Sequence, residues 1–72
     1  MGRIFASDGS ALEWEIARTP KSGFSAILRI VPPGANSVEA EAYKSLFASR
    51  EDAVAWLSAN ARARGFDAGE IS

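Results

Sequence analysis

Four glutamates are the side chains in this sequence whose spacing suggests chemistry. They form two pairs, Glu13/Glu15 and Glu39/Glu41, whose members are two residues apart. In a β-strand this spacing places both carboxylates of a pair on one face, roughly 7 Å apart. General acid–base catalysis needs a carboxyl group whose pKa is raised by burial. These glutamates alternate with apolar residues, which predicts a face in contact with water and at most weak, unselective metal binding.

The other side chains that commonly carry out catalysis are either absent from the sequence or placed on opposite faces of a strand. The 72 residues include no histidine and no cysteine, which excludes a Ser-His-Asp triad, a thiolate nucleophile, a zinc finger and an iron–sulfur cluster. Ser45 directly follows Lys44, so in a strand the two side chains point to opposite faces and form no Ser-Lys dyad. We therefore predict no enzyme activity and no catalytic, cofactor-binding or metal-binding residues.

Alternation of apolar and polar residues predicts the first strands. In residues 11–17, Leu12, Trp14 and Ile16 alternate with glutamates, the pattern of a strand with one solvated face. Residues 3–6 predict a shorter strand before it. The Asp8-Gly9 dipeptide between them predicts a hairpin turn with positive φ at both central residues.

The middle of the sequence predicts one further strand and an ambiguous segment. Residues 24–31 are rich in Ile, Leu, Val and Phe and predict a strand that ends at a Pro-Pro-Gly stretch. Residues 38–48 alternate like a strand at their start, yet their apolar residues also recur at helical spacing. A strand is favoured because the sheet edge needs a partner. The alternation changes phase near Tyr43-Lys44, which predicts a bulge or the strand's end there.

The C-terminal part predicts a helix over residues 50–64. Ser49 is a typical N-cap residue, followed by acidic residues in the first helical turn. Gly65 is suited to the left-handed residue that ends a helix. On a helical wheel Leu57 is the centre of an apolar stripe formed with alanines and Val54. Residues 67–72 predict a flexible tail.

These elements predict an α+β fold, with one domain over residues 1–66. An antiparallel three- or four-stranded β-meander carries one C-terminal helix on one sheet face (βββα or ββββα). The residues expected under the helix are Leu12, Trp14, Ile16, Phe24, Leu28 and Ile30.

Two surfaces are candidates for binding a protein partner. One is a helix face on which small residues flank an aromatic side chain, formed by Trp56, Ala59 and Ala63. The other is the back of the sheet, with Ile27, Val31, Tyr43 and Phe47 among glutamates and Arg29. In the alternative interpretation, Trp56 covers the sheet edge and the back of the sheet is a solvated face with cross-strand ion pairs.

The passage from the last strand into the helix resembles the arm-type DNA-binding domains of phage integrases. The shared pattern is Phe-x-Ser/Thr-x-x-x-Ala-x-x-Trp, present here from Phe47 to Trp56. The resemblance implies a sheet that contacts DNA through basic and aromatic residues. Glutamates occupy much of the corresponding surface here, and the positively charged residues nearby are Arg18, Lys21, Arg29 and Lys44.

Charge and composition favour protein partners over polyanions. Eight basic and nine acidic residues give a net charge of −1, whereas nucleic-acid-binding domains usually carry a basic patch. No apolar run approaches the roughly 20 residues that span a bilayer. Fourteen alanines, and six arginines against two lysines, fit a bacterial protein, which we expect to be cytoplasmic. We predict a non-enzymatic protein–protein interaction module that forms a homodimer, with weak nucleic-acid binding as the alternative.

Overall fold

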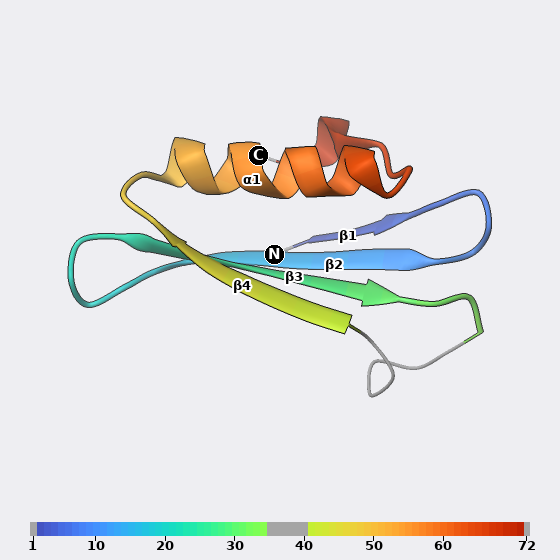
Figure 1. Ribbon diagram of the computed structural model, residues 1–72, viewed down its shortest axis with the longest axis horizontal. Coiled ribbons are helices and arrows are strands. Elements are labelled where there is room, and N and C mark those ends of the chain that lie inside the picture. Colours follow the sequence, from blue (N-terminus) through green and yellow to red (C-terminus); the bar gives the residue numbers. More distant parts are fainter. Residues whose placement is uncertain (1, 35–40, 72) are drawn as a thin grey trace.

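The chain forms an antiparallel sheet with an α-helix lying across one face (Figure 1). The computed structural model describes residues 2–34 and 41–71. The four strands lie in the order β1-β2-β3-β4 across the sheet. The predicted fold is thus confirmed in its ββββα form. The elements are β1 (Gly2–Phe5), β2 (Ala11–Arg18), β3 (Phe24–Val31), β4 (Glu41–Phe47), α1 (Arg50–Ala63) and the short 3-10 helix η2 (Ala68–Glu70).

The turn between β1 and β2 differs from the predicted one. Gly9 has a positive φ of 91°, but Asp8 does not, so the turn is not of the type that needs positive φ at both central residues. The Gly9 N–H donates to the Ala6 carbonyl at 3.1 Å, and the Ala6 N–H donates to the Ser10 carbonyl at 2.9 Å. This pattern is a three-residue hairpin loop in which glycine alone takes the left-handed conformation. The glycine was predicted correctly and the loop length was not.

The Asp8 carboxylate stabilises this turn in its charged form. Hydrogen bonds from the Ser10 hydroxyl at 2.5 Å and the Ser10 N–H at 2.8 Å lower the pKa of Asp8 from the ordinary value of an aspartate. Because the folded-state pKa is lowered, the carboxylate stabilises the turn above the unfolded-state pKa. This stabilisation is lost as the pH falls through the lower, folded value.

We expect an NMR titration to give Asp8 a midpoint below that of an ordinary aspartate, and Ser10→Ala to raise it because the hydroxyl donor is lost. Ser7→Ala in the same turn is the matched control and should leave the midpoint unchanged. An Asp8 midpoint that does not respond to Ser10→Ala would contradict the assignment.

Residues 41–47 of the ambiguous segment form a strand, β4, as predicted, but this strand contains no bulge. Its pairing with β3 is continuous from Phe24↔Phe47 to Ile30↔Glu41, so the predicted bulge or strand end near Tyr43-Lys44 is wrong. Residues 38–40 of the predicted strand lie outside the described residues. Directly opposite residues of an antiparallel pair share a face, so this register fixes which β4 side chains lie under the helix.

Both ends of α1 are closed by local hydrogen bonds. The Ser49 hydroxyl accepts from the Asp52 N–H at 3.1 Å, the predicted N-cap. At the other end the Phe66 N–H donates to the Ala61 carbonyl and the Gly65 N–H to the Arg62 carbonyl, the Schellman pattern. Gly65 has a φ of 83°, as that pattern requires. The helix ends at Ala63, one residue before the predicted end.

The core lies between α1 and the sheet. Leu12, Leu28 and Leu57 are its largest fully buried side chains, and Ile16 and Phe24 pack against it half-buried. The C-terminal segment also contributes, since Ala68 and Ile71 are buried in the same cluster. Both residues lie within residues 67–72, the segment predicted to be a flexible tail. In the described part of the chain, no helix is long and apolar enough to cross a membrane.

Candidate functional site

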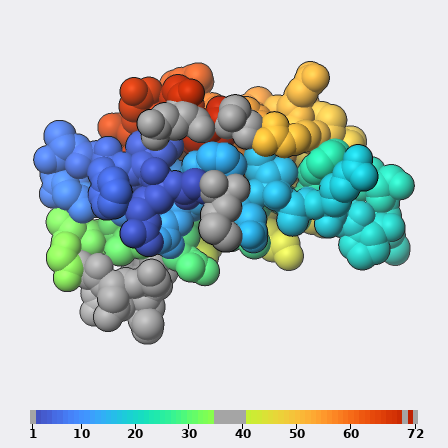
Figure 2. All heavy atoms as spheres, turned by 180° about the vertical axis from the view of Figure 1, so that it is seen from behind, coloured from blue at the N-terminus to red at the C-terminus, as the bar shows by residue number. Residues whose placement is uncertain are grey.

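The sheet face turned away from α1 is the most exposed apolar surface of the described structure. In Figure 2, α1 and η2 (orange to red) form the upper layer and the hairpin of β1 and β2 (blue) lies below them. The register places every second residue of each strand on the side opposite the helix. We call this side the open face. Its residues are Arg3, Phe5, Ala11, Glu13, Glu15, Ala17, Ser25, Ile27, Arg29, Val31, Ala42, Lys44 and Leu46.

Two large apolar side chains stand out from the open face. Phe5 is 65% exposed and Leu46 is 69% exposed. Phe5 is on the edge strand β1 and Leu46 on the opposite edge strand β4. Ile27 and Val31 lie between them on β3 and are half-buried. The open face therefore carries apolar side chains on both edge strands and in between.

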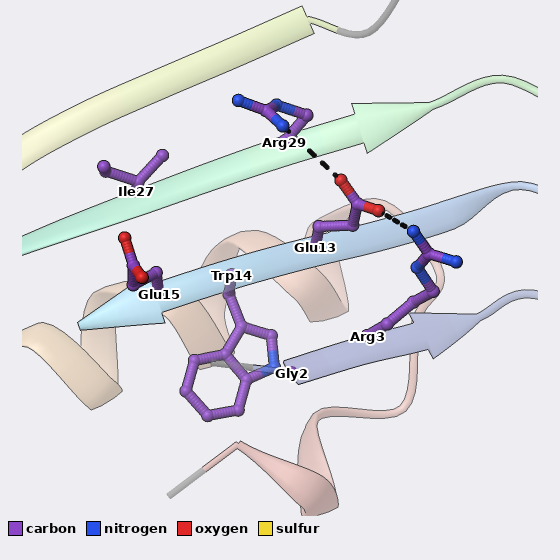
Figure 3. Close-up of a pocket in the computed structure, with 7 residues that line it drawn as sticks. All are labelled: Gly2, Arg3, Glu13, Trp14, Glu15, Ile27 and Arg29. Carbon is purple, nitrogen blue, oxygen red and sulfur yellow. Dashed lines mark hydrogen bonds and ion pairs between the residues drawn. The ribbon is translucent and has the colours of Figure 1, made fainter. Parts of the chain in front are cut away.

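A row of charged residues crosses the open face between these apolar groups. Arg3, Glu13 and Arg29 are cross-strand neighbours on β1, β2 and β3. Arg3 Nη2 forms an ion pair with Glu13 Oε2, and Arg29 Nη1 lies 3.7 Å from Glu13 Oε1 (Figure 3). One carboxylate thus lies between two guanidinium groups, which retain further N–H donors. Exposed ion pairs of this kind add little to the stability of the fold. The charged row is therefore of interest mainly as a surface for binding a partner.

A hollow of about 500 Å³ lies beside this row (Figure 3). It lies where Gly2 of β1 pairs with Trp14 of β2. Gly2 lies directly against the indole, since a Cβ atom built on it would come within 2.7 Å of the Trp14 ring. The residues that line the hollow are Gly2, Arg3, Glu13, Trp14, Glu15, Ile27 and Arg29.

The glutamate pairs do not all occupy one face. Glu13 and Glu15 both lie on the open face, as predicted. Glu41 pairs with Ile30, which puts it on the helix side of the sheet and contradicts the expected placement on the back. Glu39 lies outside the described residues. Residues 2–34 and 41–71 contain no group of three or more acidic side chains that could hold a metal ion.

Two of the aromatic residues predicted on the back of the sheet lie on the helix side instead. Tyr43 donates its hydroxyl hydrogen to Glu41 Oε2 at 2.8 Å, and the Arg64 guanidinium lies 5.3 Å from the centre of its ring. Phe47 packs against Trp56 with ring centroids 5.6 Å apart. The placement of Tyr43 and Phe47 on the back was therefore wrong, because β4 has the opposite facing from the one assumed. Ile27 and Val31 do lie on the open face.

The predicted helix surface is partly used by the fold itself. The contact with Phe47 leaves Trp56 half-buried beside the core. Ala59 and Ala63 are exposed on α1. The two predicted interaction surfaces therefore lie on opposite sides of the molecule, and the sheet side carries the larger exposed apolar groups.

The four basic residues proposed for nucleic-acid binding do not form one patch. The Arg18 guanidinium lies 5.9 Å from the centre of the Phe24 ring, on the helix side. Lys21 is exposed in the turn between β2 and β3. Only Arg29 and Lys44 share the open face, where Arg3 joins them.

Sequence reasoning missed three residues of the open face. Arg3, Phe5 and Leu46 were not singled out, although Phe5 and Leu46 are its most exposed large apolar side chains. The Arg3-x-Phe5 spacing places both on one face of a strand, and this signal was present in the sequence.

Comparisons of the chain with protein-family models, curated proteins and solved structures find no match. Function is therefore inferred from the open face itself.

Proposed function

We propose that this chain is a non-enzymatic protein–protein interaction module that pairs with a second copy of itself through the open face. The observation that carries the proposal is the exposure of Phe5 and Leu46, 65% and 69%, on the sheet side that α1 leaves uncovered. Large apolar groups exposed on an uncovered face are typical of interaction sites. Two sheets that pack face to face bury such groups in the manner of a β-sandwich.

The mixture of charges on the open face favours a second copy as the partner. Arg3, Arg29 and Lys44 provide positive charges, and Glu13 and Glu15 provide negative ones. A surface that carries both signs can be complementary to itself, as a two-fold symmetric interface requires. Strands of this length give a footprint of roughly 25 Å by 15 Å per copy, which corresponds to a weak, reversible interface.

Sedimentation velocity from low micromolar to about 1 mM protein, the range in which weak interfaces become occupied, tests the proposal. We expect the wild type to shift from the 7.6 kDa monomer towards twice that mass. Leu46→Glu should keep the chain monomeric, because it places a charge at the apolar contact. Ala59→Glu, on the exposed side of α1, is the control and should not change association.

Two results would contradict the proposal. The first is a monomer over the whole concentration range. The second is a dimer that Ala59→Glu disrupts and Leu46→Glu does not, which would assign association to the helix surface.

Weak nucleic-acid binding is the alternative function, and Arg3, Arg29 and Lys44 on one face are the observation that favours it. A mobility-shift experiment with duplex DNA at low salt separates the two functions, because phosphate contacts weaken steeply with salt. Absence of binding at low salt eliminates the alternative.

A further inference from the structure

We infer that two copies meet about a two-fold axis that runs parallel to the strands, between β2 and β3, so that Glu15 of one copy pairs with Lys44 of the other. This inference rests on the proposed function and specifies its geometry. Cross-strand pairing arranges the open face in rows that run from β1 to β4. The rows are Phe5, Ala11, Val31; Arg3, Glu13, Arg29, Ala42; Glu15, Ile27, Lys44; and Ala17, Ser25, Leu46.

Only two in-plane axes bring identical sheets face to face with their strands aligned. An axis parallel to the strands keeps each row opposite itself and reverses the strand order, so β2 faces β3 and β1 faces β4. An axis across the strands keeps the strand order and reverses the rows. The charges of the open face distinguish these two arrangements.

The central ion pair favours the parallel axis. In that arrangement Glu13 of each copy faces Arg29 of the other. The contact between Arg29 and Glu13 within one chain is long, 3.7 Å between Nη1 and Oε1, so the guanidinium has donors left for a second carboxylate. With the axis across the strands, between the rows of Glu13 and Glu15, Glu13 instead faces Glu15 of the second copy, and two like charges would be brought together.

The outer strands fit the same axis. In the row of Glu15 and Lys44, Glu15 borders the hollow. Lys44 of the second copy lies opposite the hollow. Within the described part of a single chain neither Glu15 nor Lys44 forms an ion pair. Both charges are thus available for a contact between copies.

Apolar groups complete the arrangement. In the last row Leu46 of one copy lies opposite the place beside Ala17 of the other. In the first row Ala11 faces Val31 of the second copy. Packed sheets are rotated by up to about 30° and lie about 10 Å apart, which a lysine side chain on an outer strand can span.

Charge reversal tests this geometry by sedimentation equilibrium. Glu15→Lys alone and Lys44→Glu alone should each weaken the dimer at least about tenfold, because each creates two like-charge contacts. An equimolar mixture of the two variants should associate again to within about threefold of the wild type, since each variant then meets its complement on the other chain. Glu51→Lys and Lys21→Glu, at exposed positions away from the open face, are the matched controls and should have no effect.

The possible failures are distinguishable. A wild-type chain that stays monomeric overturns the proposed function together with this geometry. A wild-type dimer for which the single variants have no effect, or for which the mixture does not recover, overturns the geometry and leaves the proposed function standing. Circular dichroism of each variant verifies that it is folded, as expected for changes at exposed or half-buried positions.

Discussion

Leu57→Ala is expected to remove about 2–5 kcal/mol from the free energy of unfolding. Leu57 is 0% exposed and lies at the centre of the buried α1 stripe, with Ala53 and Ala61 also at 0%. The alanine neighbours have no side-chain length with which to fill the space that Leu57 would leave, so the cavity would persist. A domain of this size has roughly 4–11 kcal/mol of stability in total. The variant should therefore lose a large fraction of that stability.

Urea denaturation followed by circular dichroism measures this loss. Leu46→Ala is the matched control, because it removes the same atoms from a side chain that is 69% exposed. Its effect should stay within about 0.5 kcal/mol at protein concentrations where the chain is monomeric. Similar losses for the two variants would contradict the placement of the core.

The strands β2 and β3 and the helix could be predicted because local signals in each agree. In β2 the alternation around Trp14 gives both the strand and its buried face, and the structure buries that indole. For α1 the Ser49 cap and Gly65 mark both ends of the apolar stripe around Leu57. Propensity, periodicity and capping all favour the same elements here, which is why the fold followed from the sequence.

The face of β4 could not be predicted in the same way. Apolar residues occur at both alternating sets of positions, with Ala42 and Leu46 in one set and Tyr43 and Phe47 in the other. Alternation therefore does not select a face, and a shift by one residue exchanges the two sets. Only the pairing with β3 decides, and it places Phe47 under the helix against Trp56.

The same limit applies to the candidate site. The ion pairs of Glu13 with Arg3 and Arg29 join three strands, so they depend on the registers of two hairpins. The sequence indicates that Glu13 lies on a solvated face, but not which residues of the neighbouring strands lie beside it. The hollow is lined by residues of three strands, with Gly2 lying against the Trp14 indole, and the local pattern of one strand does not determine such contacts.

The C-terminal segment was missed because six residues are too few to show a periodic pattern. Its order comes from contacts that are local or tertiary. Asp67 Oδ1 accepts from the Gly69 N–H at 3.0 Å, and the Ile71 N–H donates to the Ala68 carbonyl at 3.1 Å. The Asp-x-Gly spacing was a visible sign of this turn.

Ile71→Ala should destabilise the fold by about 2–5 kcal/mol, the range for truncating a buried isoleucine. Ile71 is 6% exposed, and it belongs to the core cluster with Phe66 and Ala68. Since η2 packs against α1, the side chain closes the end of the core instead of lying in solvent. In hydrogen exchange the Ile71 amide should be protected in the wild type and should lose that protection in the variant.

Ile27→Ala is the matched control, because it removes the same atoms from a half-buried position on the open face. Measured at monomeric concentrations, it should cost clearly less than Ile71→Ala, about 1 kcal/mol. A loss below about 0.5 kcal/mol for Ile71→Ala, the size of an ordinary surface effect, would mean that residues 67–71 behave as the flexible tail predicted from the sequence. A larger loss would show that this small domain needs its last residues to complete the core, because so short a chain buries only about 60% of its unfolded surface.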